Sequence, residues 1–131
     1  MRVSYIFSKH EVFLLMYQLG INYKKFSYVC EPFFDDDTKE ETLKSLYQKK
    51  FILANHDSIY IDKVISFIVN QLGKATKLIK SNSLQVYVCP NILLVVSFDD
   101  VNTNIIKITS IKDSAMLKEE FNIELKGGKI S

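Results

Sequence analysis

The sequence predicts an α+β protein with a mostly helical N-terminal half and a sheet in its C-terminal half. Residues 35–61 indicate a capped amphipathic helix followed by a short β-hairpin. After residue 81 the apolar residues change from helical spacing to alternation, which is typical of strands. We therefore expect a single domain over residues 1–131. It would consist of a helix-and-hairpin half over residues 1–80, a three-stranded antiparallel sheet with a short C-terminal helix over residues 81–126, and a frayed tail over residues 127–131.

Composition and charge are those of an ordinary globular protein. Hydrophobic residues make up 47% of the chain and charged residues 24%, a balance opposite to that of disordered chains. The formal net charge of +2 is too small to indicate a polyanionic partner, because nucleic-acid-binding modules concentrate basic residues on one face. No stretch approaches the ~20 apolar residues of a membrane span, and the N-terminus does not resemble a signal peptide. We expect a cytoplasmic protein without membrane contact.

The first helix is expected over residues 9–19. Ser8 and Glu11 form a capping box, in which each side chain accepts a hydrogen bond from a backbone N–H that the helix leaves without a partner. Residues 3–7 are expected to pack as an apolar lead-in to this helix, with a short strand as the alternative. Residues 23–30 are expected to form a short helix, and a strand is the competing assignment because aromatic and β-branched residues are dense there.

The second helix and the hairpin follow directly. Three aspartates at residues 35–37 precede a second capping box, formed by Thr38 and Glu41, and their charges suit the positive end of a helix. Residues 51–53 and 59–61 are expected to form the two strands of the hairpin, joined by a tight turn.

The third helix is expected to be the longest, and a sheet follows it. Asp62 caps this helix, and apolar residues repeat at helical spacing as far as Ile79. The run over residues 92–98 is apolar enough for a central strand that is buried on both faces. The three expected strands cover residues 84–88, 92–98 and 105–109. The spacing of Ser110 and Asp113 resembles a further helix cap, and a short helix is expected after it.

No arrangement of reactive side chains indicates catalysis or a metal site. Cys30 and Cys89 lie far apart and are expected to be reduced thiols, and His10 and His56 are scattered singly. Helix capping explains the aspartates at residues 35–37 better than cation binding does, because consecutive side chains point in different directions. We therefore expect no enzyme, no catalytic residues, no cofactor and no metal ion.

Aromatic residues are abundant for so short a chain, with nine Phe and seven Tyr. Aromatic side chains are enriched at protein interfaces, although core packing explains them equally well. The aromatic segment within residues 23–34 is therefore one candidate surface for another protein, and an exposed edge of the sheet over residues 84–109 is a second. The candidate contact residues of the segment are Tyr23, Phe26, Phe33 and Phe34.

Three stretches together resemble the helix, helix and wing of winged-helix proteins over residues 9–80. They are residues 11–16 (EVFLLM), residues 38–52 (TKEETLKSLYQKKFI) and residues 58–61 (SIYI). The resemblance implies a winged-helix fold and, as an alternative function, a DNA-binding transcriptional regulator whose Lys44, Lys49 and Lys50 contact phosphate. The sequence departs from the pattern in lacking a glycine before the wing strand and in placing five carboxylates at the start of the second helix, where they would repel phosphate.

The whole order of elements is also similar to small accessory proteins of type VII (ESX-like) secretion systems of Gram-positive bacteria. That similarity implies a cytosolic adaptor or chaperone that binds a secreted substrate. The preferred expectation is a non-catalytic protein-interaction module whose partner is another protein. A homodimer is compatible with the sequence, and nucleic acid is the less favoured partner.

Overall fold

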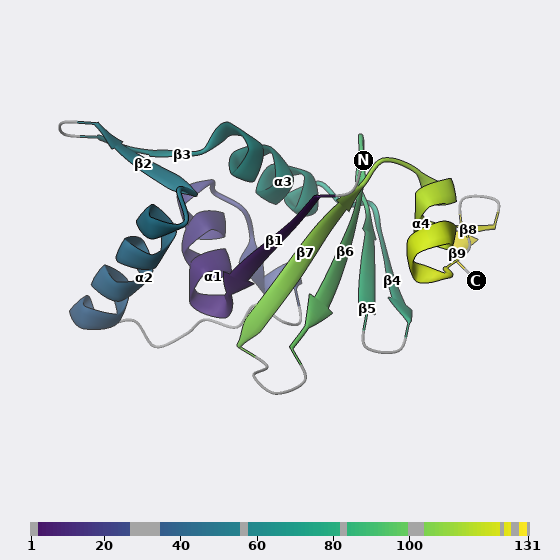
Figure 1. The fold of residues 1–131 in the computed structure, drawn as a ribbon, viewed down its shortest axis with the longest axis horizontal. Coiled ribbons are helices and arrows are strands. Elements are labelled where there is room, and N and C mark those ends of the chain that lie inside the picture. The colour runs from purple at the N-terminus through teal and green to yellow at the C-terminus, as the bar shows by residue number, and fades with distance from the viewer. Residues whose placement is uncertain are drawn as a thin grey trace. The chain divides into compact units, whose positions relative to one another are not determined.

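A computed structural model of the chain describes residues 3–26, 35–55, 58–81, 84–99, 104–123, 125–126 and 129–130. Within these residues the protein is α+β, with four α-helices, one short 3-10 helix, a five-stranded antiparallel sheet and two two-stranded ladders (Figure 1). The chain divides into two compact units. The helical unit is Ser8–Gly73, and the sheet unit combines Met1–Phe7 with Lys74–Ser131.

The helical unit contains three α-helices and the hairpin. Its elements in chain order are α1 (Lys9–Gln18), η1 (Tyr23–Lys25), α2 (Asp36–Gln48), β2 (Ile52–Asn55), β3 (Ser58–Ile61) and α3 (Lys63–Gly73). The predicted hairpin is confirmed, with β2 and β3 antiparallel. The predicted helix over residues 23–30 is reduced to the single turn of η1, and residues 27–34 lie outside the described residues.

The caps of α1 and α2 show which side chains start each helix. The predicted capping box is confirmed, because Ser8 N–H donates to Glu11 Oε1 at 2.7 Å and Glu11 N–H donates to Ser8 Oγ at 3.1 Å. The cap of α2 is Asp35, whose Oδ1 accepts from Thr38 N–H at 2.7 Å, so the prediction of Thr38 as the cap is wrong. Aspartate is the stronger N-cap residue, and the helix therefore begins earlier than the threonine indicated.

The third helix is shorter than the sequence predicted. It ends at Gly73, whose carbonyl oxygen accepts from Lys25 Nζ at 2.8 Å. The chain then forms β4 (Lys77–Ser81). Within β4 an exposed Leu78 precedes a buried Ile79, which is the alternation of a strand. Ile79 lies four residues after Ala75 and therefore also fits the helical spacing of α3, and this ambiguity made the helix prediction run too far.

The sheet is larger than predicted, so the expected three-stranded sheet is wrong. Its order is β1-β7-β6-β5-β4, in which the two strands missing from the prediction form the two edges. Strand β1 (Val3–Ser8) was expected as a lead-in to α1, and instead it pairs with β7, where Ser4 Oγ lies 2.9 Å from Thr109 Oγ1. The remaining strands are β5 (Leu84–Val88), β6 (Leu93–Phe98) and β7 (Ile105–Ile111).

Strand β6 is the middle strand of the sheet and is buried on both faces, as predicted. Val95 pairs with Val86 across the ladder and shares a core with Leu117 of α4 (Ser114–Phe121). On the opposite face Leu94 pairs with Tyr87, and both side chains are also buried. The sheet and α4 thus form a core within the sheet unit. The cap of α4 is Asp113, which accepts from Met116 N–H, whereas Ser110, the first residue of the predicted Ser110-x-x-Asp113 cap, lies in β7.

The last described elements are β8 (Leu125–Lys126) and β9 (Lys129–Ile130), which pair antiparallel. Residues 127–128 and 131 of the predicted frayed tail lie outside the described residues. Over the ranges that the structure describes, no helix combines the length and the apolar character needed to cross a membrane.

Candidate functional site

The β2–β3 hairpin carries apolar side chains on both of its faces. Its cross-strand pairs are Ile52 with Ile61, Leu53 with Tyr60, and Ala54 with Ile59. Directly opposed residues share a face and successive residues alternate, so the isoleucine-rich pairs form one face and the Leu53–Tyr60 pair forms the other. The exposed fractions are 61% for Ile59, 53% for Tyr60 and 50% for Leu53. Exposed apolar groups gathered in this way are typical of binding surfaces.

Helix α2 presents a stripe of side chains toward the isoleucine-rich face of the hairpin. Asp36, Glu40, Leu43 and Tyr47 follow one another at helical spacing along this stripe. Leu43 is half-buried and Tyr47 is 55% exposed. The stripe is therefore acidic over the first two turns of α2 and apolar over its last turns.

Two hollows lie side by side between α2 and the hairpin. One has a volume of ≈240 Å³ and is closed on one side by Leu14 and Leu15 of α1. The other has a volume of ≈350 Å³ and includes Tyr47 in its wall. Leu43, Ile52 and Ile59 line both hollows. A water molecule takes about 30 Å³ of the liquid, so each hollow has room for a side chain of a partner.

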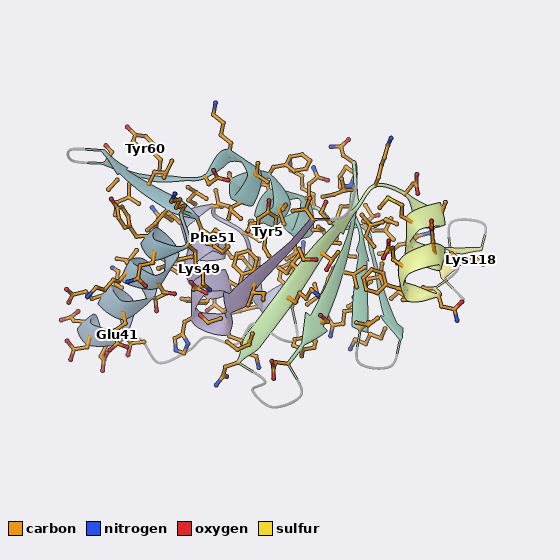
Figure 2. All side chains as sticks on the ribbon, viewed as in Figure 1. Tyr5, Glu41, Lys49, Phe51, Tyr60 and Lys118 are labelled. Atoms are coloured by element: carbon orange, nitrogen blue, oxygen red, sulfur yellow. The ribbon has the colours of Figure 1, made fainter. Side chains whose placement is uncertain are left out.

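We call these two hollows and their shared walls the α2–hairpin groove. Figure 1 shows α2 and the hairpin diverging from the point where they join. In Figure 2, Phe51 marks that junction, Tyr60 lies on the hairpin, and Glu41 lies near the start of α2. Lys39, Glu40 and Lys44 contribute to the walls of the groove, so charged side chains lie beside its apolar side chains.

Negative charge dominates the first two turns of α2. Asp36, Asp37, Glu40 and Glu41 are all exposed, and Lys39 is the basic residue among them. The carboxylate of Asp35 accepts a hydrogen bond from the Thr38 N–H, which lowers the pKa of Asp35 below its usual value and keeps the group ionised. This end of the groove therefore favours positively charged groups.

A buried carboxylate fixes α2 against α1. Glu11 is 1% exposed, and its Oε1 accepts from Lys49 Nζ at 2.6 Å while its Oε2 accepts from Ser45 Oγ at 3.0 Å. These contacts come in addition to the capping box with Ser8. The sequence indicated the capping role of Glu11, but contacts to residues more than thirty positions away carry no local signal. The network holds the helix that forms one wall of the groove.

The three lysines predicted to contact DNA phosphate have different environments. Lys44 is exposed and contributes to the wall of the larger hollow. The ammonium of Lys49 is bound to Glu11 and lies 5.8 Å from the centre of the Phe51 ring. Lys50 has a φ of +64° directly after α2, in the left-handed conformation that usually selects glycine at the end of a helix. The ammonium of Lys49 is therefore engaged with the buried carboxylate of Glu11.

Of the aromatic residues predicted to bind a partner, the structure describes two, and neither is fully exposed. Phe26 is 3% exposed, and the half-buried ring of Tyr23 packs edge-on against Phe13 with 4.7 Å between ring centres. Phe33 and Phe34 lie outside the described residues. Sequence reasoning missed the exposed apolar side chains of the hairpin. Their signal was a hairpin of about ten residues without lysine, arginine or proline, the residues that usually protect exposed strands.

Among the residues that the structure describes, no cluster of reactive side chains lines the groove. Cys89, in the sheet unit, is 8% exposed, and burial raises the pKa of its thiol to about 12. Its Sγ donates to the Tyr87 carbonyl oxygen at 3.5 Å. Among the described residues no three His, Cys, Asp or Glu side chains are placed to hold a metal ion. Cys30 and His56 lie outside the described residues.

Comparison with protein-family models, with curated proteins and with solved structures gave no match to the chain.

Proposed function

We propose that the protein is a non-catalytic interaction module that binds an apolar segment of another protein in the α2–hairpin groove. The observation that supports this most strongly is the exposure of Ile59, at 61%, beside two hollows whose walls it shares with Leu43 and Ile52. Burying such a side chain in a complex removes apolar area from water, worth about 25 cal/mol per Å². Binding energy in protein interfaces concentrates in central apolar anchors of this kind.

A narrower form of the proposal is a cytosolic adaptor or chaperone of a type VII-like secretion system. Its support is the resemblance in the order of elements. The cytoplasm as compartment is supported by Cys89, which is a buried free thiol.

The groove can be tested with a peptide library displayed on phage and selected on the immobilised full-length chain. Binders are then measured against two variants of the same hairpin, Ile59→Asp and Leu53→Asp. Both substitutions place a carboxylate on an exposed apolar position, but only Ile59 faces the groove. We expect selected peptides to share an apolar motif, to lose binding at least about tenfold with Ile59→Asp, and to keep it with Leu53→Asp. A selection without enrichment, or binders indifferent to Ile59→Asp, would contradict the proposal.

DNA binding is the alternative function, supported by the helix-then-hairpin order of α2, β2 and β3. The acidic start of α2 and the ion pair of Lys49 with Glu11 disfavour it. A gel shift with mixed-sequence duplex DNA at two salt concentrations separates the two functions. Retarded DNA at low salt that is released steeply as salt rises would favour the regulator over the interaction module, and no retardation even at low salt would exclude it.

A further inference from the structure

We infer that the partner of the α2–hairpin groove is a basic amphipathic helix, an inference that rests on the proposed function. Its apolar face fills the two hollows, and lysine or arginine side chains at one end lie over the first two turns of α2. This specifies the chemistry of the partner beyond the presence of an apolar segment.

The walls of the groove favour a helix over an extended segment. Side chains of α2 and of one face of the hairpin line it, including Leu43, Ile52 and Ile59. The backbone groups of α2 bond within the helix, and the face of a strand pair presents side chains rather than its N–H and C=O groups. An occupant must therefore satisfy its own backbone hydrogen bonds, which a helix does. An amphipathic helix in an apolar groove is an established mode of recognition.

The charges around the groove indicate that the polar side chains of the partner helix are basic. Asp36 and Glu40 lie on the same stripe of α2 as Leu43 and Tyr47, so a helix seated on the apolar part reaches both carboxylates. Asp37 and Glu41 add negative charge to the same two turns. The lysine of α2 that pairs with a buried carboxylate, Lys49, lies at the other end of the helix. Lys39 and Lys44 also contribute to the walls, but the five carboxylates of residues 35–44 outnumber these two lysines. The groove is thus apolar at one end and net negative at the other.

Two synthetic peptides test this inference. Each is an amphipathic helix of about four turns with leucines on one face, and the two differ only in carrying three lysines or three glutamates at one end. Fluorescence anisotropy with the full-length chain measures both affinities at about 50 mM and about 500 mM sodium chloride. Each peptide is also measured against a charge-reversed double variant, Asp36→Lys with Glu40→Lys. The control is Glu119→Lys, an exposed position on α4.

We expect the lysine peptide to bind about fivefold more tightly than the glutamate peptide at low salt, as two or three exposed ion pairs allow. The difference should shrink at high salt, reverse in the double variant and persist in the control. If the double variant loses helix by circular dichroism, Asp36→Asn with Glu40→Gln serves instead, and the preference should then disappear.

Equal affinities, a preference that survives the charge changes, or binding of neither peptide would overturn the inference. Failure of the proposed function gives a different pattern. If both peptides bind equally and both lose affinity with Ile59→Asp but not with Leu53→Asp, the groove remains the binding site and only the basic partner is wrong. If phage selection also yields no groove-dependent binder, the proposed function fails as well.

Discussion

Glu11 shows how one residue can serve the start of one helix and the end of another. Its carboxylate closes the capping box of α1 with Ser8 and also accepts from Ser45 and Lys49 of α2. Because the carboxylate is 1% exposed, each partner replaces water that burial has removed. The position of the groove wall therefore depends on a polar network that does not touch the groove itself.

Removing Lys49 should destabilise the protein more than its position at the end of α2 suggests. Lys49→Met leaves the buried Glu11 carboxylate without its cation, and we expect the free energy of unfolding to fall by about 1–2 kcal/mol, since Lys49 is partly exposed and screened. Adding Glu11→Gln keeps the capping geometry and removes the charge, so the double variant should be more stable than the sum of the two single changes predicts. Urea unfolding measures all three. Strict additivity would contradict this account of the network.

Cys89 allows a test of pH dependence. Its pKa is raised from 9.0 to about 12 by burial, so the folded protein keeps the proton that the unfolded chain loses. The free energy of unfolding should therefore be unaffected below pH 9 and fall as the pH rises from 9 toward 12.

In a Cys30→Ser variant, the remaining thiol should react with a disulfide reagent at pH 8 about a hundredfold more slowly when folded than in urea. Equal rates would show that the thiol is accessible.

At the scale of elements, the end of α3 is set by close packing. A Cβ at Gly73 would lie 3.0 Å from Ile21 Cγ2, closer than carbon atoms normally approach. We expect Gly73→Ala to lower the free energy of unfolding by about 1–2 kcal/mol, although alanine is the better helix former. In an Ile21→Ala background, where those side-chain atoms are gone, the same change should be neutral or stabilising. A cost that persists in that background, measured by thermal unfolding, would argue against the contact with Ile21.

The elements that the sequence predicted well are those with a local signal. The capping box at Ser8 and the hairpin strands depend on neighbouring residues, and the structure has both. Strand β1 was not the preferred prediction because its pairing with β7 joins residues about a hundred positions apart, as between Ser4 and Thr109. Strand β4 was predicted as part of the third helix because Ile79 also fits the helical period of α3.

The sequence did not indicate the exposed side chains that line the groove, again for a physical reason. Hydrophobicity alone does not distinguish a core aromatic from an exposed one. Phe26 and Tyr23 were chosen for their aromatic character, and Phe26 is buried and Tyr23 half-buried, whereas Ile59 and Tyr60 are exposed because the hairpin extends away from α2. Burial of this kind follows from tertiary packing, which the local sequence does not encode.

At the scale of the whole molecule, the helical unit is an insertion along the chain. Strand β1 precedes it and β4 follows it, and both are edge strands of one sheet. The sheet therefore requires the first residues of the chain as well as its C-terminal half. All the residues that line the groove belong to the helical unit, which lies in the sequence between the two edge strands.

Hydrogen–deuterium exchange with and without a bound peptide tests the central claim most directly, because it reports where the partner lies. A peptide from the phage selection, added to the full-length chain at saturation, should slow amide exchange within residues 39–47, 52–54 and 59–61, the segments that supply the α2 and hairpin walls of the groove. Exchange in β5 and β6 of the sheet unit should not change. Slower exchange confined to the sheet strands, with none in α2 or the hairpin, would show that the binding surface lies elsewhere and would contradict the account.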